Sequence, residues 1–246
     1  MDKSIWIGHE PREAAAFAVA RSSIRRVGTL REIPVKGVVL SKLRADGLYT
    51  RPTSIRDGRL WDNISEAPMA TEFAISRFLV PHLAKAQPQQ SVGPRLAVFM
   101  DCDMLIRKPL YPLFSGFDPG KAVAVVKHSH NPTSTTKMDG QVQTRYARKN
   151  WSSVMVFNID HPANEALTVD LINTVPGRDL HAFCWLKDDE IGELNQEWNH
   201  LVGHSQAINS PNPAIVHFTE GIPLMAGYEQ CEYADEWRAE LDNWAR

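Results

Sequence analysis

The 246-residue sequence is short of cysteine, of a dominant charge and of long apolar runs. Its three cysteines are scattered without metal-binding spacing, which argues against a disulfide framework and suits a reducing compartment. The formal net charge of −2 indicates no sequence-independent nucleic-acid binding. No apolar run approaches the roughly 20 residues that span a bilayer, and the first residues turn polar too soon for a signal peptide. We therefore expect a cytoplasmic protein without a transmembrane segment.

Segments with the pattern of strands alternate with segments that have the pattern of helices. We expect strands at 4–7, 35–40, 96–100, 122–127, 152–159 and 214–218, and helices at 12–25, 71–83, 162–173 and 234–244. The polar stretches 43–67 and 128–150 are expected to be mostly loop, the second lying over a site. This alternation predicts an α/β fold whose sheet is covered on both faces. No repeat or linker divides the chain, so we expect a single domain.

The segment from Arg95 to Ile106 carries the strongest functional signal. An apolar run with the composition of a buried strand ends at Asp101 and Asp103, and apolar residues then resume. Two carboxylates at this position are costly to desolvate without a positive partner. Mg²⁺ or Mn²⁺ prefers such hard oxygen ligands and often brings a diphosphate with it. The alternative is a turn in which the two side chains cap backbone amides.

A histidine, an arginine and an acidic pair elsewhere in the chain carry weaker signals. His217 follows a short apolar strand, where a neutral imidazole is either a Mn²⁺ ligand or a structural residue. Arg77 precedes the Asp-x-Asp strand and either contacts a donor phosphate or forms a surface salt bridge. Asp188 and Asp189 belong to an acidic cluster that either serves a reacting centre or begins a solvated helix.

Five segments occur in order along the chain. They are the first strand and helix, 75–81, 99–103 with 109–110, 152–158, and 194–199 with 217–221. In this order and spacing the chain, from about residue 5 to about residue 223, resembles the retaining nucleotide-sugar glycosyltransferases of family 8, which include glycogenin and bacterial lipopolysaccharide galactosyltransferases. The resemblance implies the GT-A fold, an α/β domain with a mixed, mostly parallel sheet flanked by helices.

The resemblance also implies a function and a set of residues. The activity is transfer of a hexose from a UDP-sugar to an acceptor hydroxyl with retention, with Mn²⁺ or Mg²⁺ held by Asp101, Asp103 and His217. Asp188 or Asp189 faces the reacting sugar as the catalytic carboxylate. The nucleotide-binding part covers about residues 1–105, the acceptor and sugar part about 106–230, and a terminal helix 232–246. The residues implied in binding the donor are Gly8, His9, Arg77, Asp101, Cys102, Trp151 and Ser152.

The sequence departs from the family pattern at two places. The lysine that follows the late histidine and helps to hold the donor diphosphate is missing, because Ile222 and Pro223 come after Gly221. Trp151 stands in a segment where the family has a smaller residue, so it either stacks on a sugar ring or reshapes the pocket. Cations that can replace the lysine are Lys127, Lys137, Arg145, Arg148 and Lys149.

Two other functions compete with sugar transfer. A haloacid-dehalogenase-like phosphatase also has Asp-x-Asp after an apolar strand, but its nucleophile lies near the N-terminus and Leu105 stands where threonine or valine is usual. A catalytically silent sugar-nucleotide-binding module accounts for the missing lysine. The acceptor stays open between a glycan, a lipid-linked molecule, a protein and a modified nucleobase.

Overall fold

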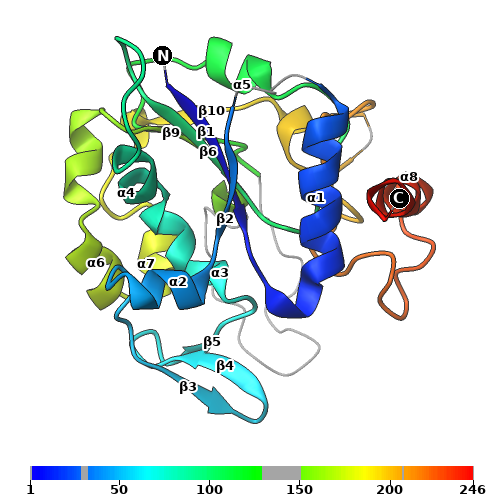
Figure 1. The fold of residues 1–246 in the computed structure, drawn as a ribbon, viewed down its shortest axis with the longest axis horizontal. Helices are drawn as coiled ribbons and strands as arrows, with labels where there is room; N and C mark the ends of the chain where they lie inside the picture. Colours follow the sequence, from blue (N-terminus) through cyan, green and yellow to red (C-terminus); the bar gives the residue numbers. More distant parts are fainter. Residues whose placement is uncertain (1, 29–32, 129–150, 207, 246) are drawn as a thin grey trace.

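A computed structural model describes residues 2–28, 33–128, 151–206 and 208–245 and has a central six-stranded sheet with helices on both faces (Figure 1). Its strand order is β10-β8-β9-β6-β1-β2, and only β9 runs antiparallel to its neighbours. The strands are β1 (Lys3–Gly8), β2 (Val35–Val38), β3 (Thr53–Arg56), β4 (Arg59–Asp62), β5 (Ala67–Pro68), β6 (Leu96–Met100), β7 (Met104–Ile106), β8 (Val123–Val125), β9 (Val154–Asn158), β10 (Ile191–Glu193), β11 (His200–Leu201) and β12 (Ile215–His217).

Most helices are short, and several are single 3₁₀ turns. The α-helices are α1 (Ala14–Arg26), α2 (Leu40–Ala45), α3 (Phe73–Ser76), α4 (Val80–Lys85), α5 (Tyr111–Ser115), α6 (Val169–Thr174), α7 (Gly177–His181) and α8 (Ala234–Trp244). The 3₁₀ turns are η1 (Pro11–Glu13), η2 (Arg77–Leu79), η3 (Trp151–Ser153), η4 (Pro162–Ala166), η5 (Asp188–Glu190) and η6 (Gln196–Trp198). None of the described helices is long and apolar enough to cross a bilayer.

The central strand β6 is buried along its whole length, which explains why its sequence is apolar without alternation. Figure 1 shows α1 on one face of the sheet with α8 against its outer side, while α2, α3, α4, α6 and α7 cover the other face. Buried Glu240 fastens α8 to α1, because it pairs with Arg26 and accepts a hydrogen bond from Ser22 Oγ. The predicted α/β fold with a mixed, mostly parallel sheet is confirmed.

Two smaller sheets complete the fold. The chain leaves the main sheet after β6, and β7 pairs antiparallel with β12 in a three-stranded sheet of order β11-β12-β7. The antiparallel sheet β3-β4-β5 lies below the other elements in Figure 1. It falls in a stretch predicted to be mostly loop. The sequence signal for it is Asp57-Gly58, which takes φ of 50° and 72° in the turn between β3 and β4, because two-residue hairpin turns require positive φ.

Two predicted helices are interrupted in the structure. The helix expected at 71–83 is divided into α3, η2 and α4, and the helix expected at 162–173 into η4 and α6. The second break occurs at Thr168, whose side chain caps α6 by accepting from Leu171 N. The loop predicted at 128–150 lies outside the described residues except for His128.

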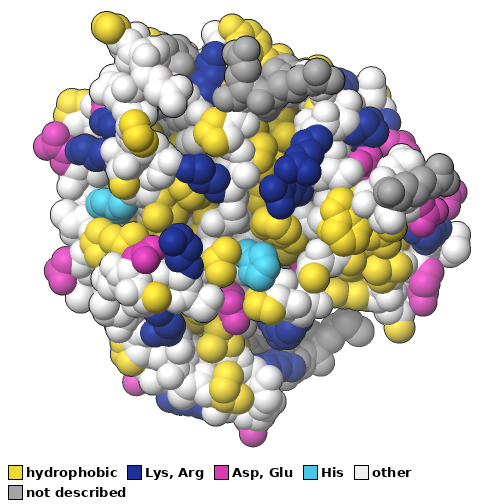
Figure 2. Space-filling view, viewed as in Figure 1, with side chains coloured by type: hydrophobic (Ala, Val, Ile, Leu, Met, Phe, Trp, Pro, Cys, Tyr) yellow, Lys and Arg dark blue, Asp and Glu magenta, His cyan; other side chains and the backbone are white. Residues whose placement is uncertain are grey.

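Figure 2 shows basic and acidic side chains interspersed on the face seen in Figure 1, in keeping with the net charge of −2.

Candidate active site

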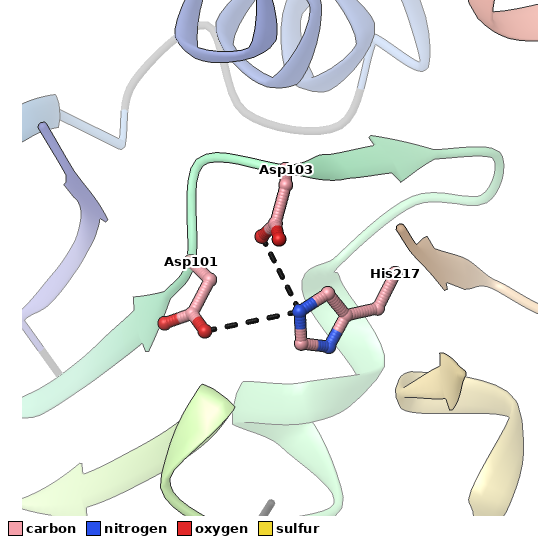
Figure 3. A group of neighbouring side chains, drawn as sticks. All are labelled: Asp101, Asp103 and His217. Carbon is pink, nitrogen blue, oxygen red and sulfur yellow. Dashed lines mark ion pairs between the residues drawn. The ribbon is translucent and has the colours of Figure 1, made fainter. Parts of the chain in front are cut away.

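Backbone pairing brings Asp101, Asp103 and His217 together. Asp101 follows β6, and its amide donates to Ser153 O at 3.1 Å. The β12–β7 register sets His217 opposite Met104, and Phe218 N donates to Asp103 O at 2.9 Å. Figure 3 shows both carboxylates directed at the His217 ring, and one ligand atom of each residue lies within 4.8 Å of the others. Residues far apart in the sequence thus form one cluster at the end of the central strand.

The donor set of this cluster fits a divalent cation. His217 Nε2 lies 3.3 Å from Asp103 Oδ1 and 3.8 Å from Asp101 Oδ2. Asp101 Oδ1 and Asp103 Oδ1 are buried without an aligned hydrogen bond to the described part of the chain. Arg77 Nη1 is 2.8 Å from Asp101 Oδ1, but this contact is an ion pair rather than an aligned hydrogen bond. Two partly buried carboxylates whose Oδ1 atoms lack an aligned hydrogen bond, beside an imidazole, suit Mn²⁺ or Mg²⁺.

The hydrogen bonds behind His217 select the tautomer that a metal ligand needs. Asn199 Nδ2 donates to Ser153 Oγ at 2.8 Å, so Asn199 Oδ1 is the atom that faces His217 Nδ1, at 3.1 Å. Nδ1 therefore carries the proton, and the lone pair of Nε2 points at the two aspartates. Asn199 and His217 are both buried, so the surrounding protein restricts the amide and the imidazole to this orientation.

Replacing Asn199 by alanine is expected to weaken Mn²⁺ binding about 10- to 100-fold, because loss of such a partner releases the ring and its tautomer. Titration calorimetry with Mn²⁺ measures this change. Ser153→Ala is the matched control, since it removes the partner of Asn199 and leaves the contact with His217. Equal losses in the two variants would contradict an orienting role for the Asn199 oxygen.

Burial and mutual repulsion set the protonation of the cluster. Burial raises the pKa of Asp101 to about 6, with Arg77 opposing the shift and Asp103 adding to it. Burial acts to lower the pKa of His217, but the carboxylates of Asp103 and Asp101 outweigh it and the net shift is upward. Burial, followed by the charge of Asp103, also raises the pKa of Glu13, which accepts from Cys102 Sγ at 3.7 Å. Without a cation, the cluster holds protons in mild acid.

We expect the stabilisation of the protein by Mn²⁺ to shrink as the pH falls through about 6. The pKa of Asp101 is raised in the folded protein, so protons compete with the metal for its carboxylate below that pH, whereas above it the carboxylate is free to bind. The measurement is the metal-induced rise in Tm at pH about 7.5 and about 5. A rise of equal size at both pH values would count against Asp101 as a ligand.

Arg77 lies inside the molecule, so the surface salt bridge considered for it is wrong. Its guanidinium lies 5.2 Å from the Phe73 ring centroid and 5.0 Å from that of Phe99, and it donates to Ser152 O at 2.9 Å. Together with its ion pair to Asp101, these contacts give the guanidinium one position. Arg77 therefore places Asp101 relative to the segment that begins at Ser152.

A cavity of about 670 Å³ opens in front of the cluster. Of the residues predicted for the site, those that line it are Arg77, Asp101, Asp103, Ser152 and His217. Its apolar wall includes Pro68 and Met69 from the β4–β5 region. Helix α7 adds Gly177, Arg178 and His181. The cavity thus has a charged end at the cluster and walls of mixed polarity.

The structure does not bring Asp188 and Asp189 to this cavity. Both are exposed in η5, immediately before β10. Because β10 runs in the same direction as β6, the start of β10 and the end of β6 lie at opposite edges of the sheet. The backbone of Asp189 accepts a hydrogen bond from Lys121 Nζ at 2.7 Å. The acidic cluster therefore begins a turn at the edge remote from Asp101.

Four other predicted residues lie near the cluster but not on the cavity wall. Gly8 ends β1, and a Cβ there would come within 2.5 Å of the Phe73 ring, so only glycine lets α3 approach β1. His9 contacts the Phe17 ring with centroids 5.2 Å apart, and its Nδ1 is buried without a partner in the described chain. Cys102 is buried, and burial raises the pKa of its thiol.

Trp151 is the fourth of these residues. Its Nε1 donates to His128 O at 3.2 Å, and Lys127 Nζ lies 5.6 Å from its ring centroid. Trp151 does not line the cavity, so the geometry of the cavity does not support its predicted contact with a sugar ring. Of the predicted replacement cations, Lys137, Arg145, Arg148 and Lys149 lie outside the described residues.

Sequence reasoning missed Asn199 and His181 as members of the site. Asn199 follows Trp198 in a segment that the family resemblance includes, so the resemblance was the signal that pointed to it. His181 lies in a stretch without a recognisable motif, and only the fold places it on the cavity.

Comparisons with known proteins agree with this architecture. No family model matches the chain. Over 243 residues the chain is 37% identical to Protein CDI of Arabidopsis thaliana, and the match covers 98% of this chain and 86% of that protein. The chain belongs to the family of Protein CDI.

Solved structures with a similar fold are glycosyltransferases. The bifunctional glycosyltransferase WbbM has a TM-score of 0.64 at 16% identity, and the match covers 98% of this chain and 50% of that one. Galactosyltransferase LgtC, solved with donor and acceptor sugar analogues, has a TM-score of 0.56 at 13% identity over 98% of this chain and 95% of its own. GlyE of Streptococcus pneumoniae has a TM-score of 0.59 at 14% identity over 99% and 62%.

These identities show the fold alone, and the chain spans only about half the length of the WbbM chain. At the level of fold, the resemblance to GT-A glycosyltransferases is confirmed.

Proposed function

We propose that this protein is a metal-dependent glycosyltransferase that moves a hexose from a UDP-sugar to an acceptor hydroxyl with retention of configuration. The observation that carries the proposal is the convergence of Asp101, Asp103 and His217 at the end of a cavity. The Oδ1 atoms of both carboxylates, which are buried without an aligned hydrogen bond to the described residues, support a cation there. The fold shared with LgtC and GlyE supports a sugar nucleotide as the molecule that the cation binds.

Each residue of the cluster has a defined task in this proposal. Asp101, Asp103 and His217 hold the cation, while Arg77 positions Asp101 and Asn199 positions His217. A cation held there would supply stabilisation of the negative charge that builds on the departing nucleoside diphosphate. The partial burial of Asp101 and Asp103 and the burial of His217 strengthen this electrostatic effect, because charges interact more strongly away from bulk water.

Other residues of the cavity can contact the donor in place of the acidic pair. Because Asp188 and Asp189 lie at the other edge of the sheet, the groups available to the transferred sugar are those of η3 and α7. Arg77 and Arg178 are the cationic side chains among the described residues that line the cavity. Arg77 is held by Asp101, whereas Arg178 is exposed and pairs at 3.5 Å with its neighbour Asp179, so Arg178 is the described cation that we assign to the place of the missing lysine.

The acceptor that the comparisons support best is a carbohydrate hydroxyl. LgtC was solved with an acceptor sugar analogue, and this chain covers 95% of it. The phosphatase alternative has no support from the fold, whose solved neighbours described above transfer sugars. The silent binding module differs from the proposal only in turnover, so a turnover assay separates the two.

The test is release of UDP from a panel of UDP-sugars, with Mn²⁺ or with a chelator, first without an acceptor and then with simple sugars. We expect one donor to be hydrolysed slowly with Mn²⁺ and not with the chelator, because water replaces the acceptor in a site that still activates the donor. Release of phosphate from an aryl phosphate instead would support the phosphatase. Metal-dependent UDP binding without release from any donor would support the silent module.

A further inference from the structure

His181 lines the cavity but has no task in the proposed function. It ends α7, and its Nδ1 lies 2.7 Å from Ser152 Oγ. The edge of its ring packs on Phe78, with centroids 5.2 Å apart and planes at 74°. Two contacts on different sides leave the imidazole with one orientation.

The second ring nitrogen of His181 is left without a partner among the described residues. Nε2 makes no hydrogen bond within the part of the chain that the structure describes, and it is not among the atoms closed off from solvent. His181 is also one of the residues that form the cavity wall. A fixed ring that presents one unused polar atom to a cavity is built to contact a ligand.

A short series of contacts joins His181 to the metal end of the cavity. Ser152, its partner, accepts from Arg77 Nη1 at 2.9 Å through its backbone oxygen. Arg77 in turn pairs with Asp101 at 2.8 Å. His181 and the Asp101 cluster therefore line one cavity and are linked through Ser152 and Arg77, which puts His181 within the surroundings available to a sugar on a diphosphate held at that cluster.

The charge state of His181 restricts what it does there. Burial, and then the positive charge of Arg77, lower the pKa of His181 to about 3. The ring is therefore neutral near pH 7, and this pKa is too low for proton transfer as a general base or acid at that pH. A neutral imidazole acts instead as a hydrogen-bonding group for a hydroxyl.

We propose that Nε2 of His181 hydrogen-bonds a hydroxyl group of the transferred sugar, and that Ser152 positions the ring for this contact. The inference rests on the proposed glycosyltransferase function and names the residue that recognises its donor sugar. It also explains how the site binds the sugar without the acidic pair that lies at the other edge of the sheet.

Two substitutions of His181 test the roles of its two ring nitrogens separately. The amide of asparagine reaches the position of Nδ1 and stops short of Nε2, whereas the amide of glutamine reaches the position of Nε2. His181→Asn is expected to lower kcat/KM for the UDP-sugar that the release assay identifies about tenfold or more, through loss of one substrate hydrogen bond. His181→Gln is expected to retain most of the activity. Mn²⁺-dependent binding of UDP, which lacks the sugar, is expected to change less than about twofold in both variants.

His82→Asn is the matched control, because among the described residues the His82 side chain makes one hydrogen bond, to Leu167 O at 2.7 Å, and does not line this cavity. Full activity of His181→Asn would overturn the inference. A parallel loss of UDP binding and of Tm would also overturn it, because His181 would then be structural. If the wild-type protein releases UDP from no donor while the histidine variants bind UDP normally, the proposed function fails first and the assignment of His181 to a sugar fails with it.

Discussion

Replacing Asp103 by alanine is expected to lower donor turnover at least about 100-fold, since metal stabilisation of a leaving group contributes several kcal/mol. Asp103 supplies a ligand atom to the cluster, and its Oδ1 is buried without a hydrogen bond to the described chain. Its charge also raises the pKa of Asp101 and of Glu13, so it repels its neighbours in the absence of metal. The metal-free variant should therefore melt at the wild-type temperature or above it.

The measurements are turnover of a UDP-sugar with Mn²⁺ and the Tm without metal. Asp235→Asn is the matched control, because Asp235 is almost fully exposed and its ion pair among the described residues is with Arg238 on the surface of α8. A low Tm in Asp103→Ala would mean that the residue supports the fold. Wild-type turnover would remove Asp103 from the site.

Replacing Arg51 by methionine is expected to lower the free energy of unfolding by about 3–5 kcal/mol, because it leaves a buried carboxylate without its partner. Arg51 and Asp62 are both almost completely buried, and Arg51 Nε donates to Asp62 at 3.0 Å. Arg51 Nη1 also donates to the carbonyls of Ile172 at 2.8 Å and Val175 at 2.7 Å. One side chain thus joins the β4 region to α6.

Thermal and denaturant unfolding measure this loss, which corresponds to a fall in Tm of roughly 6–20 °C for a chain of this size. Arg238→Met is the control, because it removes an arginine from an exposed ion pair with Asp235, and such pairs contribute only about 0–1 kcal/mol. Similar losses in the two variants would contradict the special importance of the buried pair. Asp62 and Ser65 also line the cavity, so weakened donor binding is expected to accompany the lower stability.

Part of the metal cluster was predictable because two of its three residues lie close together in the sequence. Asp101 and Asp103 follow a strand that is buried throughout, and the cost of burying two carboxylates points to a cation without knowledge of the fold. His217 required the family resemblance, because its approach depends on the pairing of β12 with β7. Asn199 and His181 are single polar residues whose roles arise only after the chain has folded around them.

The acidic pair and the hairpin show two different limits of sequence reasoning. The cluster at Asp188 has the right residue type, but composition does not reveal at which edge of the sheet a segment lies, and it lies opposite Asp101. The β3–β4 hairpin had a valid Asp57-Gly58 signal. Its strands show weak periodicity because Ile55, the apolar residue of β3, is 69% exposed while the partly buried residues of β3 are polar, so no apolar face marks that strand.

The most direct test of the central claim is calorimetric titration of UDP into the metal-free protein and into the protein with Mn²⁺. If Asp101, Asp103 and His217 hold a cation that binds the donor diphosphate, UDP binds at least tenfold more tightly with Mn²⁺, and UDP tightens Mn²⁺ binding by the same factor, because the coupling between two ligands is reciprocal. The Asp103→Ala variant should lose this coupling. Equal UDP affinity with and without Mn²⁺ in the wild-type protein would contradict the account.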